Sequence, residues 1–187
     1  MAFSKPTHII YELVGAYFQS LYANPIKTKA LTSCCIATLG NFVAQKLAGT
    51  KYLNQDSIIA FALFGFIFGG PVPHYFYQYV RNVTKHPLGI LLIERLLYTP
   101  FFQALSLYML ARFEGKSHEV SYSQLEKLYR PVLIANLKYL TVFQFINITF
   151  VPPMLRVLVV NLIGFFWSIY LATKRAKQSA KDRASKE

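Results

Sequence analysis

The sequence has few of the residues that build metal centres, disulfide scaffolds or nucleophilic active sites. Its two cysteines, Cys34 and Cys35, are adjacent in an apolar segment and lack the spacing of a metal knuckle or a redox pair. Its four histidines are scattered and show no ligand spacing: His8, His74, His86 and His118. No arrangement of nucleophile, base and orienting group can be recognised. We therefore expect no metal, no cofactor and no enzymatic activity.

Acidic residues are also scarce, and the charge imbalance indicates the kind of partner. Eight Asp and Glu stand against twenty Lys and Arg, which gives a net charge of +12. Eleven of these basic residues lie in the N-terminal segment, the 80–89 loop and the C-terminal tail, next to hydrophobic segments. The positive-inside rule and anionic lipid headgroups favour this pattern. No basic patch is interleaved with stacking aromatics on a nucleic-acid-binding motif. We expect membrane lipid as a partner, and no nucleic acid.

What the sequence has in abundance is apolar side chains. Hydrophobic residues make up 54% of its 187 residues, and the mean hydropathy of +0.33 is too high for a soluble single domain. Roughly 20 apolar residues suffice to cross a bilayer core. The sequence therefore predicts an all-α integral membrane protein, a bundle of four transmembrane helices plus amphipathic N-terminal and penultimate helices. The four predicted spans are 30–48, 58–79, 88–111 and 154–172.

We divide the chain into three parts. Residues 1–29 form an N-terminal amphipathic segment, residues 30–173 the transmembrane helical bundle, and residues 174–187 a basic soluble tail. With four spans, the N-terminal segment, the 80–89 loop and the tail share one side of the membrane. Because that side is richer in Lys and Arg, we expect both termini to be cytosolic.

The first predicted span carries two stripes. Small residues recur at spacings of three and four, a pattern that lets another helix backbone approach closely. Beside them runs a polar stripe that includes Thr38, Asn41 and Gln45. Polar groups at membrane depth are costly unless they pair or meet water, so this stripe should face inward. Two interpretations carry equal weight: hydrogen bonding between helices, and the lining of a pore.

The second and third spans contain a helix breaker and a pair of charges. Gly70 and Pro71 begin a Gly-Pro-Val-Pro sequence that must bend the second span, and His74 follows directly. The third span carries Glu94 and Arg95 near its start. Because neighbours in an α-helix point about 100° apart, we expect these two residues to pair with other helices rather than with each other. Charges at this depth mark a functional site, and a structural ion pair is an equal rival.

The segment before the last span is polar for a membrane helix. Residues 112–130 are expected to form a polar loop. Residues 132–150 contain Gln144 and Asn147 among aromatic side chains. We predict a helix there that packs against the bundle and enters the membrane only partly.

Short motifs cover most of the chain from about residue 20 to residue 173, and their order is specific. They include Asn24-Pro25, Leu39-Gly40-Asn41-Phe42, Gly70-Pro71 with His74, Glu94-Arg95 with Pro100, Gln144-Phe145-Ile146-Asn147, and Trp167 with Tyr170-Leu171. This set resembles the small family of peroxisomal and mitochondrial inner-membrane proteins that includes peroxisomal membrane protein 2. The resemblance implies an oligomeric protein of four membrane helices with both ends in the cytosol. For the peroxisomal branch it implies a pore for small water-soluble metabolites.

The expected function is therefore a membrane channel that lets small water-soluble metabolites cross the peroxisomal membrane as a homo-oligomer. The alternatives are a non-catalytic membrane scaffold or assembly protein, and a mitochondrial inner-membrane channel of the same family. An intramembrane enzyme that uses His74 and Glu94 has the least support. The candidate pore-lining or kink residues are Thr38, Asn41, Gln45, Gly70, Pro71, His74, Glu94, Arg95, Gln144 and Asn147.

Overall fold

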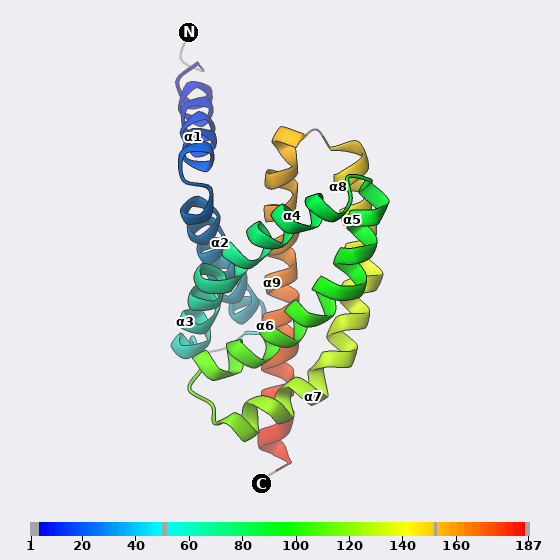
Figure 1. Cartoon of the computed structure of the whole chain (residues 1–187). Helices are drawn as coiled ribbons and strands as arrows, with labels where there is room; N and C mark the ends of the chain where they lie inside the picture. Colours follow the sequence, from blue (N-terminus) through cyan, green and yellow to red (C-terminus); the bar gives the residue numbers. More distant parts are fainter. Residues whose placement is uncertain (1–3, 50–51, 152, 186–187) are drawn as a thin grey trace.

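The protein folds as a bundle of helices (Figure 1). The computed structural model describes residues 4–49, 52–151 and 153–185, and within these ranges every regular element is helical. The all-α class predicted from the sequence is confirmed.

The first two helices are joined by a short bend. α1 (Ser4–Ala23) leads through Asn24 into α2 (Pro25–Leu47). Pro25 opens the second helix because it lacks an N–H and its backbone angle is already helical. α1 stands apart from the bundle in Figure 1, and it exposes the apolar side chains of Tyr11, Leu13 and Tyr22.

The next three long helices are each interrupted by a π-helical segment of five residues. Such segments are rare and are often found at functional sites. The first long helix consists of α3 (Gln55–Phe64), η1 (Gly65–Gly69) and α4 (Pro71–Val83). The second consists of α5 (Pro87–Ile93), η2 (Glu94–Tyr98) and α6 (Thr99–Phe113). The third consists of α7 (His118–Ala135), η3 (Asn136–Leu140) and α8 (Thr141–Phe150).

The last helix, α9 (Pro153–Ala184), completes the bundle and packs against α2, α7 and α8. The buried core joins five helices, α2, α3, α6, α7 and α9. Its residues are Ala44, Ala60, Phe61, Phe64, Leu107, Leu110, Leu128, Val132, Leu171 and Ala172.

The outer surface fits a lipid environment. Among the described residues, two helices are long and apolar enough to cross a membrane, Gln55–Val83 and Pro87–Phe113. Large apolar side chains stand exposed around the bundle, for example Leu39, Leu63, Leu92, Leu96, Phe101, Val142 and Phe166. In water so much exposed apolar surface favours association, whereas lipid tails accommodate it.

Two predicted boundaries are wrong. The expected loop at 112–130 is helical from His118 onward, because the Ser117 hydroxyl accepts the backbone N–H of Val120 and caps α7. The expected separate tail at 174–187 continues α9 as far as Ala184. Its Arg175 side chain is only 3% exposed, so this part of α9 belongs to the packed bundle.

The expectation that both termini are cytosolic stays a prediction, and the arrangement of the helices bears on it. α7, η3 and α8 together run the length of the bundle, so α1 and the end of α9 lie at opposite ends (Figure 1). Contacts between distant residues agree with this view. Gly70 lies against Ala30 at the end nearest α1, whereas Arg175 pairs with Glu114 at the other end.

Candidate functional site: a buried polar network

An ion pair lies inside the bundle at the start of η2. The Glu94 and Arg95 side chains are only 6% and 11% exposed, and Arg95 Nη2 donates to Glu94 Oε1 at 3.0 Å. We expected these residues to pair with other helices rather than with each other; the mutual pair contradicts the second half of this expectation, and contacts with other helices confirm the first. A π-turn holds more residues than an α-turn, so adjacent side chains diverge by a smaller angle, and the long guanidinium reaches back. The opposite charges satisfy each other where an unpaired charge is very costly.

Both charges also contact other helices. Gln144 of α8 donates from Nε2 to Glu94 Oε2 at 3.1 Å and to the Tyr77 hydroxyl of α4 at 2.9 Å. Arg95 Nη1 donates to Asn136 Oδ1 of η3 at 3.0 Å. The ion pair therefore links α4, η2, η3 and α8.

The network continues along α6. Asn136 Nδ2 donates to Gln103 Oε1 at 3.2 Å, and Gln103 Nε2 donates to the Ser106 hydroxyl at 3.0 Å. Gln103 is 3% exposed, Ser106 4% and Asn136 9%. Beyond Ser106 the buried apolar core begins, with Leu107 and Leu110 both at 0% exposure. The polar network thus occupies one part of the bundle and ends against an apolar layer.

Three buried polar atoms beside this network have no hydrogen-bond partner: Arg95 Nε, the Tyr98 hydroxyl and Asn147 Oδ1. Tyr98 ends η2, one turn after Glu94, and its ring stacks on Phe76 with centroids 4.2 Å apart. Asn147 is 3% exposed and follows Gln144 by one turn of α8. A buried polar atom without a partner costs roughly 1–3 kcal/mol, so these atoms are candidate contacts for a water molecule or a polar solute.

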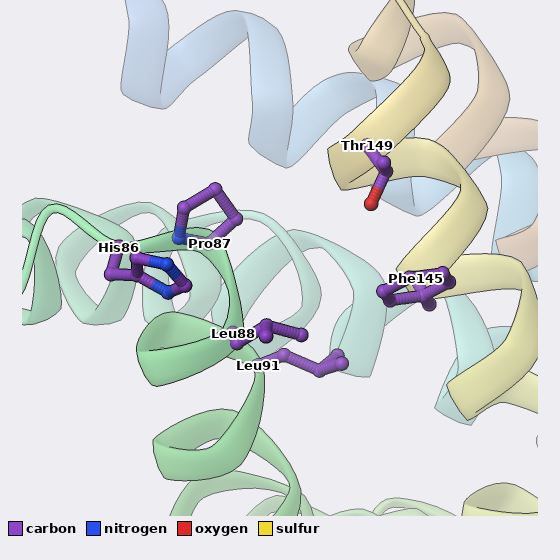
Figure 2. Close-up of a pocket in the computed structure, with 6 residues that line it drawn as sticks. All are labelled: His86, Pro87, Leu88, Leu91, Phe145 and Thr149. Atoms are coloured by element: carbon purple, nitrogen blue, oxygen red, sulfur yellow. The ribbon is translucent and has the colours of Figure 1, made fainter.

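A pocket of about 350 Å³ opens next to the network (Figure 2). Its walls come from the first turns of α5 and from α8. Its lining residues are His86, Pro87, Leu88, Leu91, Phe145 and Thr149. His86, Leu88 and Thr149 are exposed, which places the mouth of the pocket at the protein surface, whereas Leu91 is buried.

The polar stripe of α2 has a different role from this network. Asn41 is 1% exposed; it donates to the Ser57 hydroxyl at 3.0 Å and accepts from Gln45 Nε2 at 2.7 Å. Gln45 also binds both backbone groups of Asn54, the N-cap of α3. Thr38 donates to the Cys34 carbonyl of its own helix. Of the two interpretations, these contacts support hydrogen bonding between helices.

The remaining predicted residues lie at the bend between η1 and α4. A Cβ placed on Gly70 would stand 2.5 Å from the Ala30 backbone, so only glycine allows this approach to α2. Pro71 opens α4. His74 Nδ1 lies 3.1 Å from the Lys29 ammonium. The predicted interruption at Gly70 and Pro71 is confirmed, and His74 serves as a hydrogen-bond partner between helices.

The structure brings Glu94, Arg95 and Gln144 into one network, with Asn147 beside it, and leaves the α2 stripe outside. The sequence reasoning missed Tyr77, Gln103 and Asn136. The spacing of four from Arg95 through Thr99 to Gln103 was a signal for a continuous polar face on one helix. Nothing in the sequence indicated that Asn136 would meet that face.

A second ion pair fixes the far end of α9. Arg175 donates to both Glu114 oxygens at 2.8 and 3.0 Å, and the Lys116 ammonium lies 2.8 Å from Glu114. Burial alone would raise the pKa of Glu114, but the charges of Arg175 and Lys116 outweigh it and hold this pKa below its ordinary value. Burial lowers the pKa of Arg175, whereas the neighbouring Glu114 carboxylate acts in the opposite direction.

Together, these features define an all-helical membrane protein with a charge-bearing polar network inside its bundle. Within the described residues, no group of three or more His, Cys, Asp or Glu side chains forms a potential metal site.

Comparison with known proteins then identifies the family. Residues 111–172 match the Mpv17 / PMP22 family. PXMP2/4 family protein 3 of Dictyostelium discoideum is 33% identical over 184 residues, which is 95% of this chain and 99% of that protein. Peroxisomal membrane protein 2 of Bos taurus is 34% identical over 172 residues, 86% of this chain and 88% of that protein. The chain belongs to the Mpv17 / PMP22 family.

The family also includes mitochondrial relatives. The mitochondrial inner membrane protein Mpv17 of Caenorhabditis briggsae is 25% identical over 175 residues, 91% of this chain and 97% of that protein. No solved structure matches the chain. The expected location in the peroxisomal membrane, with the mitochondrial inner membrane as the alternative, agrees with these relatives.

Proposed function

We propose that the protein is a non-catalytic membrane channel that lets small water-soluble metabolites cross the peroxisomal membrane. The observation that carries this proposal is the Glu94–Arg95 ion pair, buried with three unpartnered polar atoms beside it. Hydrocarbon makes such groups costly, whereas a hydrated interior satisfies them. The resemblance stated above adds support, because it implies a pore.

The number of membrane crossings decides the topology of this channel. The expected four-span topology places both ends in the cytosol and requires that residues 132–150 do not cross. The run from α7 to α8 is as long as the spans beside it and separates the two ends of the chain in Figure 1. We therefore favour a fifth crossing, with the termini on opposite sides. Homo-oligomer formation remains part of the proposal, because the resemblance to the family implies it.

The rival function is a membrane scaffold, and one observation favours it. The amides of Asn41 and Gln45 bind Ser57 and Asn54 within the same chain, so polar residues at membrane depth also serve helix contacts. A scaffold needs only contacts of this kind. The alternative of a mitochondrial inner-membrane channel keeps the same mechanism in another membrane.

Reconstitution separates these functions. The purified full chain, shown to be monodisperse and to unfold cooperatively in detergent, is incorporated into planar bilayers of neutral lipid. A channel gives discrete current steps that are absent from a mock preparation from cells without the protein. A folded preparation that never conducts eliminates the channel and leaves the scaffold.

A further inference from the structure

The pocket and the ion pair lie on one continuous seam between α5 and α8. Leu88 and Leu91 line the pocket on α5, and Glu94 and Arg95 follow Leu91 by three and four residues, on the same side of the helix. On α8, Phe145 lines the pocket and its neighbour Gln144 binds Glu94. Figure 2 shows the pocket, with His86 and Thr149 among its lining residues. The charges follow Leu91 by about one helical turn.

The polar atoms without partners lie along this seam. Asn147 Oδ1 is an acceptor on α8, the Tyr98 hydroxyl both donates and accepts, and Arg95 Nε is a donor. The three come from both walls, η2 and α8, and all are buried. Together they offer a polar solute hydrogen bonds of both kinds beside the ion pair.

We infer that each protomer holds its own solute path, which enters at the pocket and passes the Glu94–Arg95 pair. This inference rests on the proposed channel function and locates the path inside the chain instead of on an axis between copies. The two fixed charges beside the path, one carboxylate and one guanidinium, cancel. The path therefore takes small uncharged solutes that donate and accept hydrogen bonds, such as polyols, and selects weakly by charge.

The same geometry explains why the path is closed in this structure. Past Ser106, the Leu107, Leu110 and Val132 side chains are fully buried and form an apolar layer. An apolar constriction of this kind excludes water and acts as a gate. The path opens only when this layer of α6 and α7 separates.

Substitutions that remove one charge test whether the solute path passes the Glu94–Arg95 pair. The full chain is reconstituted in planar bilayers and the reversal potential is measured across a KCl gradient. Glu94→Gln leaves the Arg95 charge alone and should shift the permeability ratio toward chloride. Arg95→Gln should shift it toward potassium, and the double variant should return it close to the parent ratio. We expect each single shift to be about fivefold, the factor produced by one unit charge about 4 Å away in water-like surroundings.

The second buried ion pair provides the matched control. Glu114→Gln removes the same charge from a similarly buried pair at the other end of the bundle, outside the seam, and should leave the ratio unchanged. If the parent protein conducts but neither substitution in the Glu94–Arg95 pair shifts the ratio, the path runs elsewhere, for example between copies, and the channel itself stands. An equal shift from Glu114→Gln also overturns the location. A parent protein that never conducts overturns the proposed function itself.

Two further variants and one control test the path even if the charge variants fail to fold. Asn147→Asp keeps the shape of a side chain whose oxygen has no partner, and it should shift the ratio toward potassium. Leu91→Trp should fill the pocket and lower the conductance of each current step at least twofold. Leu92→Trp, on the same helix and 59% exposed, should not. Equal conductance in both tryptophan variants removes the pocket from the path.

Discussion

The close approach between η1 and α2 is testable through a single methyl group. Gly65 of η1 is buried against α2, and a Cβ placed on it would stand 2.6 Å from the Ser33 carbonyl oxygen and 2.9 Å from Cys34 Cα. Both are backbone atoms, which cannot swing aside as a flexible side chain does. Gly65→Ala must therefore push α2 and η1 apart. Overpacking of this kind costs roughly 1–3 kcal/mol.

The measurement is thermal unfolding of the purified protein in detergent. For a chain of this size, 1 kcal/mol changes Tm by about 2–4 °C, so Gly65→Ala should unfold about 2–12 °C below the parent protein. The matched control is Gly164→Ala in α9, where an added Cβ meets nothing within 4 Å. Alanine favours the helix over glycine by up to about 1 kcal/mol, so this control should unfold at or slightly above the parent Tm. A Gly65→Ala protein as stable as the control would refute the tight contact between α2 and η1.

Three other predictions follow from the contacts and the chain path. Because the folded state stabilises the ionised form of Glu114, this residue contributes to the free energy of unfolding above its ordinary pKa of 4.5, and the contribution is lost as the pH falls below that value. Urea titrations at several pH values should show this decline in the free energy of unfolding, and Glu114→Gln should remove it. Asn41→Ala should lower the free energy of unfolding by about 1–3 kcal/mol, because it deprives Ser57 and Gln45 of buried partners, and an equal loss in Thr38→Ala would contradict this. Protease added outside intact organelles should cleave a tag at one chain terminus and spare a tag at the other. Cleavage of both tags would support the four-span topology instead.

The features predicted well from the sequence are those set by local chemistry. Proline and glycine determine where helices start and bend, so the interruption at Gly70 and Pro71 was predictable from residue type alone. The small-residue seam of α2 was predictable for the same reason. Gly40 indeed lies against α9, where an added Cβ would meet Ser168 at 2.5 Å.

What could not be predicted depends on partners distant in the sequence. The sequence of α7 resembled a loop because the helix buries polar residues such as Ser121 and Gln124. Their polarity interrupts the helical periodicity of apolar residues. Arg175 resembled a residue of a solvated tail because its partner, Glu114, lies 61 residues away. The pairing of Glu94 with Arg95 depended on a π-turn, and ordinary α-helical geometry argued against it.

The place of α9 in the bundle has a consequence for the order in which the protein is made. Its contact with α2 joins segments more than 100 residues apart, so α2 emerges from the ribosome long before the helix that covers its small-residue seam. Until α9 is synthesised, Gly40 lacks its neighbour and Glu114 lacks its principal counter-ion. Contacts that close over such long stretches of chain form slowly. A nascent chain of this protein therefore carries an exposed seam and a carboxylate that has only Lys116 as a counter-ion, which favours wrong pairing with other copies unless a chaperone shields them.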